Sequence, residues 1–153
     1  MYNKVIIDGN SLTIEQIVSV SRYYAKVEIT EEAKRNISKC RKYIENNYIS
    51  ENAAIAYGVN TGFGALRNKK IPYYRLRQLQ RNLIVSHSAG VGHYLPIEVV
   101  RAIMLLRVNS LANGYSGIRL TTVNTLVEML NKGVHPAVPE KGSVGASGDL
   151  API

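Results

Sequence analysis

Hydrophobic and polar residues recur along most of this chain at the spacing of amphipathic α-helices. The segments with this spacing are 13 to about 24, 31–44, 72 to about 87, 96 to about 113 and 117–130. Near the N-terminus, Val5-Ile6-Ile7 followed by Asp8-Gly9 predicts a short strand that runs into a turn. The pattern therefore predicts a mainly α fold with a short N-terminal β-strand.

Residues at the expected helix ends support these predictions. Thr13 and Gln16 have the spacing of a capping box at the start of the first helix. Pro96 fits the first position of the fourth helix, because proline lacks a backbone donor that would be unused there. Within the second helix, Cys40 shares a face with apolar residues, so we expect it to be a buried small hydrophobic residue.

The composition is that of an ordinary globular chain. Its 153 residues, 46% of them hydrophobic, give room for one compact domain with a real core. The single cysteine excludes an internal disulfide framework, offers no metal cluster and fits a reducing cytoplasm. The N-terminus lacks the apolar core of a signal peptide, and no apolar run approaches the roughly 20 residues that would span a bilayer. We therefore expect a cytoplasmic protein without a metal and without a membrane partner.

The net charge of +8 raises one alternative of another kind, a non-enzymatic basic module that binds nucleic acid. Such a surface needs clustered basic residues, whereas those of this chain are scattered. The densest run, from Lys34 to Lys42, lies on a predicted helix and is interpreted as its solvated face. Nucleic-acid binding is therefore the remote alternative.

The stretch 142–152 reads Gly-Ser-Val-Gly-Ala-Ser-Gly-Asp-Leu-Ala-Pro and is rich in glycine. Glycine lets backbone fold closely on backbone, so the amide nitrogen of Gly148 can approach the carbonyl carbon of Ala146. Cyclisation there, with loss of water and dehydration of Ser147, would give a five-membered ring that carries an electrophilic methylene. The simpler alternative is a loop that enters a helix, with Ser147 or Asp149 as the N-cap.

A second glycine-rich stretch, Tyr57-Gly58-Val59-Asn60-Thr61-Gly62-Phe63-Gly64, predicts a loop. It does not fit a phosphate cradle, which needs a lysine and a serine or threonine after its last glycine, because Ala65-Leu66 stand there. Taken alone, Tyr57 is interpreted as a packed aromatic residue.

The third stretch, Ser86-His87-Ser88-Ala89-Gly90, lies at the end of the predicted helix 72–87. A lone histidine beside glycine is more often structural or exposed to solvent than catalytic. His93 and His135 lack comparable surroundings, and we assign them structural roles.

Taken in their order along the chain, the three stretches resemble motifs of the aromatic amino acid ammonia-lyase and aminomutase family, and the resemblance covers nearly all 153 residues. It implies the large helical-bundle fold of that family. Residues 1–95 would be an N-terminal α(+β) domain that carries the Tyr57 loop and the His87 segment. Residues 96–153 would begin the central helical bundle and end in the Ala-Ser-Gly motif, so the chain is expected to be truncated.

The resemblance also implies the groups that do the chemistry. Ala146, Ser147 and Gly148 are expected to form the prosthetic group 4-methylideneimidazole-5-one (MIO) autocatalytically, without a metal or a nucleotide. Tyr57 would be the general base that removes a proton from the substrate. The stretch around it would be the active-site loop, with the residues Gly58, Asn60, Thr61, Gly62 and Gly64.

Ser86 and His87 would contact the substrate side chain, and this pair matches the histidine-specific branch of the family. The implied reaction of the intact protein, a homotetramer, is elimination of ammonia from L-histidine to give trans-urocanate. Tyrosine-specific ammonia-lyases usually carry His-Leu at these positions, and phenylalanine-specific ones usually carry Phe-Leu. Some tyrosine aminomutases also carry Ser-His-Ser, so a tyrosine ammonia-lyase or a tyrosine 2,3-aminomutase remains the alternative.

Overall fold

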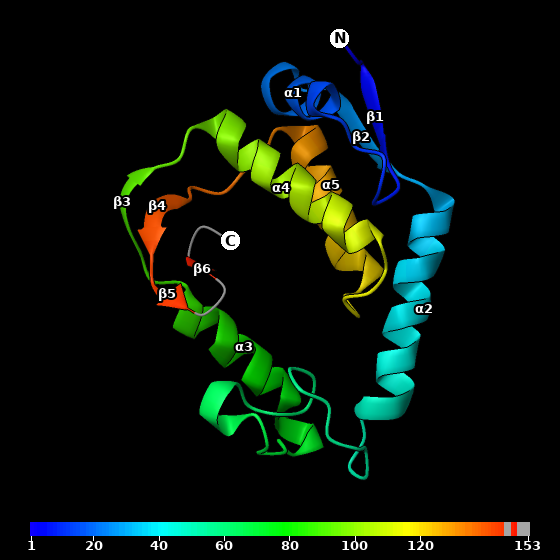
Figure 1. Ribbon diagram of the computed structural model, residues 1–153, viewed down its shortest axis with the longest axis vertical. Helices are drawn as coiled ribbons and strands as arrows, with labels where there is room; N and C mark the ends of the chain where they lie inside the picture. Colours follow the sequence, from blue (N-terminus) through cyan, green and yellow to red (C-terminus); the bar gives the residue numbers. More distant parts are fainter. Residues whose placement is uncertain (146–147, 150–153) are drawn as a thin grey trace.

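The computed structural model describes residues 1–145 and 148–149 of the chain (Figure 1). The helices are α1 (Ile14–Tyr23), α2 (Glu31–Tyr48), α3 (Leu76–His87), α4 (Ile97–Ala112) and α5 (Leu120–Lys132). The strands are β1 (Lys4–Ile7), β2 (Lys26–Ile29), β3 (Gly90–Tyr94), β4 (Pro139–Gly142), β5 (Val144–Gly145) and β6 (Gly148–Asp149). Short 3-10 helices, η1 (Gly64–Leu66) and η2 (Tyr73–Arg75), lie between α2 and α3. The mainly α fold with a short N-terminal strand is confirmed.

The chain begins with a β1–α1–β2 unit whose two strands pair in parallel. Helix α1 is the crossover that parallel neighbours require. Its predicted capping box is confirmed, because the backbone N–H of Gln16 donates to Thr13 Oγ1 and that of Thr13 donates to Gln16 Oε1. The sequence pattern does not predict β2. One edge of β2 pairs with β1. At its other edge, the side chain of Asn131 on α5 donates to the carbonyl oxygen of Val27 and accepts from its backbone N–H.

The turn between β1 and α1 is held to the end of α4. The carbonyl oxygen of Gly9 accepts hydrogen bonds from the side-chain amides of Asn109 and Asn113, at 3.3 and 3.1 Å. Hydrogen bonds from the backbone N–H groups of Asn10 and Ser11, together with the Ser11 hydroxyl, lower the pKa of Asp8 to about 2. An ionised carboxylate therefore orders the turn at neutral pH.

Helix α4 lies at the centre of the hydrophobic core. Its residues Val100, Leu105 and Val108 are at most 2% exposed. It contacts α1, α2, α5 and β1 (Figure 1). The core joins residues on both sides of position 95/96. The division into an N-terminal domain and a bundle at this position stays a prediction.

The sequence pattern does not predict that an arginine is buried in the core. Arg101 on α4 is 0% exposed, and its guanidinium donates to the carbonyl oxygens of Val20 (2.9 Å) and Leu130 (3.1 Å). These carbonyls lie in the last turns of α1 and α5, where helix dipoles place partial negative charge. The guanidinium also lies 4.0 Å from the ring centroid of Tyr24. Burial lowers the pKa of Arg101, but a guanidinium stays protonated in proteins, so a charge ties two helix ends together.

Residues between α2 and α4 extend away from this core, and Figure 1 shows α3 apart from α4 and α5. No residue of α3 is buried, although the whole helix lies in the described part of the chain. Of the apolar positions predicted for this helix, Leu76, Leu79 and Leu83 are half-buried, whereas Tyr73 lies in η2 and is 55% exposed. Strand β3, which follows α3, pairs antiparallel with β4.

Some predicted details are wrong. Cys40 is only half-buried, because α2 lies at the edge of the core and buries Ala33 and Ile37 alone among its residues, all of them described. Helix α5 begins at Leu120 and not near 117, because Gly117 has a φ of +69°, which is incompatible with a right-handed helix. Pro96 is the N-cap of α4 and not its first helical residue, since its ψ of 145° is extended.

Candidate functional site

The predicted glycine-rich loop is held from inside by Asn60, which is 2% exposed. Its Oδ1 accepts a hydrogen bond from the backbone N–H of Ala56 at 2.8 Å. Its Nδ2 donates to the carbonyl oxygens of Tyr48 and Ala54, at 3.1 and 2.8 Å. Only a carboxamide both accepts and donates in this way. Asn60 therefore supports the loop and is not exposed for chemistry.

Thr61 and Lys70 fasten the same loop. Thr61 is fully buried, and its hydroxyl accepts from the backbone N–H of Gly58 and donates to the carbonyl oxygen of Gly62. Lys70 forms an isolated β-bridge with Thr61, and its Nζ donates to the backbone carbonyls of Glu51 (3.0 Å) and Ala53 (2.6 Å), in the segment that precedes the loop. The sequence does not reveal this role, because Lys70 follows another lysine and looks like part of a solvated surface.

The loop glycines are required by the backbone. Gly58 and Gly64 have φ values of +75° and +55°, which glycine adopts at little cost. At Gly62, an added Cβ would lie 2.6 Å from the Cβ of Leu66. These residues give the loop its shape.

Tyr57 lies on the outside of the loop. It is 63% exposed, and its ring packs edge-on against Phe63, with ring centroids 5.7 Å apart. Tyr57 is not part of the hydrophobic core, and its ring packs on Phe63 within the loop itself. The loop instead presents the phenol to its surroundings while one ring contact orients it.

His87 is the last residue of α3 and is half-buried. Its Nδ1 lies 2.8 Å from the carbonyl oxygen of Leu83, one turn earlier, and 2.9 Å from Ser86 Oγ. The Ser86 hydroxyl also donates to the Leu83 carbonyl, at 2.8 Å. The ring, the hydroxyl and the carbonyl form one closed cluster at the end of the helix.

Strands β3 and β4 link this cluster to the C-terminal motif (Figure 1). Gly90, the first residue of β3, is opposite Gly142, the first residue of the motif. Gly145 and Gly148 are then ladder partners in β5 and β6. Ala146 and Ser147 lie outside the described residues. The pairing brings the backbone on either side of them together, which fits the close backbone approach that MIO formation needs.

The Tyr57 loop and His87 lie at opposite ends of α3. The loop is tied to the segment before the helix, through the N–H of Ile71 and the carbonyl oxygen of Asn60 (2.8 Å). The helix has 12 residues and is therefore about 18 Å long. Among the residues that the structure describes, no hydrogen bond, ion pair or ring contact joins the loop to His87. The chain thus links His87 to the motif and keeps Tyr57 at the far end of the helix.

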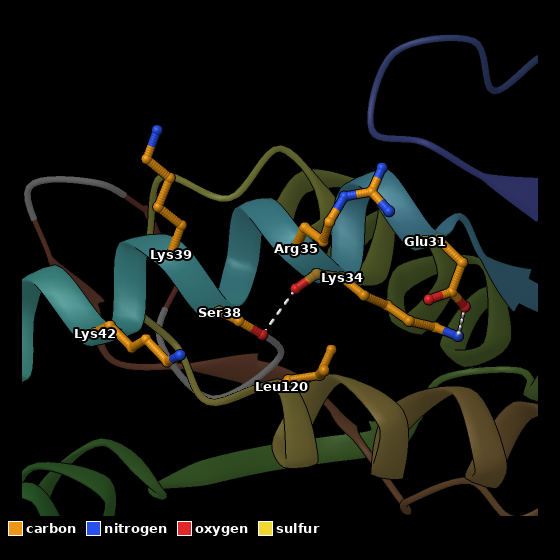
Figure 2. A pocket seen from close by; sticks show the side chains of 7 residues that line it. All are labelled: Glu31, Lys34, Arg35, Ser38, Lys39, Lys42 and Leu120. Carbon is orange, nitrogen blue, oxygen red and sulfur yellow. Dashed lines mark hydrogen bonds and ion pairs between the residues drawn. The ribbon is translucent and has the colours of Figure 1, made fainter.

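A shallow groove lies elsewhere, between α2 and the start of α5 (Figure 2). Its lining residues are Glu31, Lys34, Arg35, Ser38, Lys39, Lys42 and Leu120. Lys34 is paired with Glu31 at 2.7 Å, and the other basic residues are exposed. The prediction of a solvated basic helix face is confirmed, and none of the candidate site residues lines this groove.

Within 1–145 and 148–149, no group of three or more His, Cys, Asp or Glu side chains is arranged to hold a metal ion. In the same ranges, no helix combines the length and the hydropathy needed to cross a bilayer.

The family model described as aromatic amino acid lyase matches residues 12–153, a range that contains all three motifs. The chain belongs to this family. One relative, the histidine ammonia-lyase of Alkaliphilus oremlandii, is 52% identical over 150 residues, which is 98% of this chain. The match covers 29% of that relative, so the chain spans less than a third of its length.

Solved structures of the family have the same fold. Histidine ammonia-lyase from Trypanosoma cruzi superposes with a TM-score of 0.81 at 42% identity, covering 93% of this chain and 27% of that one. Tyrosine aminomutase from Streptomyces globisporus superposes with a TM-score of 0.86 at 37% identity, covering 92% of this chain and 26% of that one. The predicted family and its helical fold are confirmed.

Proposed function

We propose that the intact protein is an ammonia-lyase that converts L-histidine to trans-urocanate and ammonia. The observation that carries this proposal is the 52% identity to the Alkaliphilus oremlandii histidine ammonia-lyase along 98% of the chain. The Ser86-His87 pair, which matches the histidine-specific branch, supports the same substrate. Because the chain spans 29% of that relative, the proposal concerns the whole protein.

Tyr57 is the proposed general base, whose Oη takes a proton from Cβ of the substrate. Its exposed phenol and the loop that Asn60 and Thr61 hold in place support this role. A fixed loop limits the orientations of the phenol, and proton transfer gains from such positioning.

Ala146, Ser147 and Gly148 are the proposed precursors of MIO. Once formed, the group supplies an electrophile that makes the substrate amine a better leaving group. Replacing Ser147→Ala in the intact protein should remove nearly all activity, because the methylene has no other source. Mass spectrometry of the wild-type protein should show a loss of two waters. An active enzyme of unmodified mass would contradict this assignment.

His87 is the proposed binding residue for the substrate side chain. Its position beside the strand that pairs with the motif supports this role. In the intact protein, His87→Phe should weaken turnover of L-histidine far more than it changes the mass loss that reports MIO. Unchanged histidine kinetics would exclude the role.

We further propose a homotetramer that works in the cytoplasm. The single cysteine suits a reducing compartment. Tyr57 and His87 lie at opposite ends of α3, and β3 and β4 link His87 to the motif that contains Ser147. This separation supports a site to which one copy contributes Tyr57 and another contributes His87 and Ser147. Mixing and refolding two inactive variants of the intact protein, Tyr57→Phe and Ser147→Ala, should then restore part of the activity. If no activity is recovered, one copy supplies both Tyr57 and Ser147 to the same site.

A tyrosine ammonia-lyase or tyrosine 2,3-aminomutase is the second candidate. It is favoured by the TM-score of 0.86 to tyrosine aminomutase, against 0.81 to histidine ammonia-lyase. The deciding experiment offers L-histidine and L-tyrosine separately to the intact protein and follows arylacrylate absorbance and β-amino acids. Urocanate alone supports the first candidate, whereas coumarate or β-tyrosine supports the second.

A further inference from the structure

We infer that the Leu83 carbonyl and the Ser86 hydroxyl together set the tautomer of His87, so that Nδ1 carries the ring proton and Nε2 presents a lone pair to the substrate ring. This inference rests on the proposed function and makes it more specific. Ser86 would act through His87 and would therefore be a positioning residue. The cluster of Leu83, Ser86 and His87 at the end of α3 carries the argument.

The first step is the contact between His87 Nδ1 and the carbonyl oxygen of Leu83, at 2.8 Å. A carbonyl oxygen only accepts hydrogen bonds. The contact is favourable when Nδ1 carries the proton. With the proton on Nε2, the lone pairs of nitrogen and oxygen would face each other at this distance.

The second step is the direction of the Ser86 hydroxyl. It donates to the same Leu83 carbonyl, at 2.8 Å. The lone pairs of Oγ are then what faces His87 Nδ1, at 2.9 Å. Oγ is a second acceptor for the Nδ1 proton. All three contacts are attractive together in this tautomer, and removing the hydroxyl leaves the proton with a single acceptor.

The consequence lies on the other side of the ring. Among the described residues, His87 Nε2 has no hydrogen-bond partner. In the Nδ1-protonated neutral tautomer, Nε2 is an acceptor and selects a substrate ring that donates. The imidazole of L-histidine carries an N–H donor, whereas the phenyl ring of L-phenylalanine offers none.

Ser88 provides a matched control at the same helix end. Its hydroxyl donates to the carbonyl oxygen of Ile84 at 2.6 Å, which is the bond between a serine and the residue four positions earlier. Within the described part of the chain, this hydroxyl makes no hydrogen bond with the His87 ring. Ser86→Ala and Ser88→Ala each remove one hydrogen bond at the helix end. Only Ser86→Ala also removes an acceptor from His87 Nδ1.

The first test reads the tautomer directly, by solid-state ¹⁵N NMR of intact protein labelled at histidine. The His87 signal is assigned by difference from His87→Gln, in alkaline buffer where free imidazole is neutral. We expect Nδ1 protonation in the wild type and in Ser88→Ala, and a smaller Nδ1-protonated fraction in Ser86→Ala, where one of the two acceptors is lost. Nε2 protonation in the wild type, or an unchanged spectrum in Ser86→Ala, would overturn the inference. This spectrum needs no turnover, so it stands even if L-histidine proves not to be the substrate.

The second test measures the kinetic effect on L-histidine. Ser86→Ala should raise KM about two- to tenfold, the range expected for one hydrogen bond, and should change kcat less. Ser86→Thr, which keeps the hydroxyl, should restore KM, and Ser88→Ala should leave it unchanged. Equal effects of Ser86→Ala and Ser88→Ala would show that only the helix end matters and would refute the role of Ser86.

Discussion

Arg101 is a fully buried cation whose partners are carbonyl oxygens instead of carboxylates. The carbonyl ends of α1 and α5 supply the negative partial charge. The ring of Tyr24 adds a cation–π contact at 4.0 Å. Burial of a charge is costly without such partners, so Arg101 stabilises the core only while both helix ends stay in place.

We predict that Arg101→Met lowers the free energy of unfolding of the intact protein by about 3 kcal/mol, because two buried carbonyls lose a charged donor. Urea unfolding followed by circular dichroism measures the change. Arg107→Met is the control, since Arg107 is exposed on the same helix, and it should stay within about 0.5 kcal/mol of wild type. Similar losses in both variants would contradict the role of Arg101.

Asn60 offers a second test on the residue scale, one that bears on Tyr57. Asn60→Asp keeps the side-chain shape but turns the Nδ2 donor into an oxygen that faces the carbonyls of Tyr48 and Ala54. We expect loop amides to exchange with solvent about tenfold faster and activity to fall, because the phenol loses its fixed position.

Hydrogen exchange with mass spectrometry on the intact protein makes this measurement. Asn52→Asp, at an exposed position just before the loop, controls for the added charge. If exchange in the loop were the same in Asn60→Asp and in wild type, Asn60 would not hold the loop.

On the scale of elements, glycines that follow a helix determine how closely the next element packs. Gly114 follows α4 with a φ of +77°, and an added Cβ would lie 2.8 Å from the backbone carbonyl carbon of Asn36 on α2. Gly64 has a similar φ of +55°, but an added Cβ would meet nothing within 4 Å. The two positions share a backbone conformation and differ in the contact between elements.

We predict that Gly64→Ala costs about 1 kcal/mol of stability, from the backbone conformation alone. Gly114→Ala should cost about 1–3 kcal/mol more, because α4 and α2 must move apart. Thermal unfolding of the two variants of the intact protein measures the difference. Equal melting temperatures would mean that the contact with Asn36 relaxes without cost.

On the scale of the whole molecule, the part of the chain between α2 and α4 exposes large apolar side chains. Ile84, Val85, Val91 and Tyr94 are 66–70% exposed. Apolar surface of this extent in one region is typical of an interface. This exposed apolar surface is consistent with a chain that covers 29% of the histidine ammonia-lyase of Alkaliphilus oremlandii.

We predict that the 153-residue chain by itself is catalytically inactive and associates in solution. In the homotetramer that we propose, the site would draw on residues from the rest of the protein and from several copies, and in this chain alone the apolar surface of α3 and β3 would be uncovered. An assay with L-histidine at alkaline pH, on protein whose mass is verified, tests activity, and light scattering tests association. Steady urocanate production by this chain would contradict the prediction.

Local patterns were enough for the helices and for the three motifs. The capping box of α1 and the Thr30 N-cap of α2 depend on residues three positions apart, so a sequence shows them directly. The apolar repeat of α4 likewise predicts burial because it follows from helical geometry. The motifs are contiguous, so the sequence alone shows them in order along the chain.

Contacts between distant residues were decided only by the tertiary structure. The partners of Arg101 lie 81 and 29 positions away, and the side chain that pairs with β2 is 104 positions from it. No local pattern shows such contacts, because they exist only once the core has formed. The sequence alone determined the three motifs, and with them the residues that we propose for the chemistry. The tertiary structure decided that α3 separates Tyr57 from His87, because a helix sets a fixed distance between its ends.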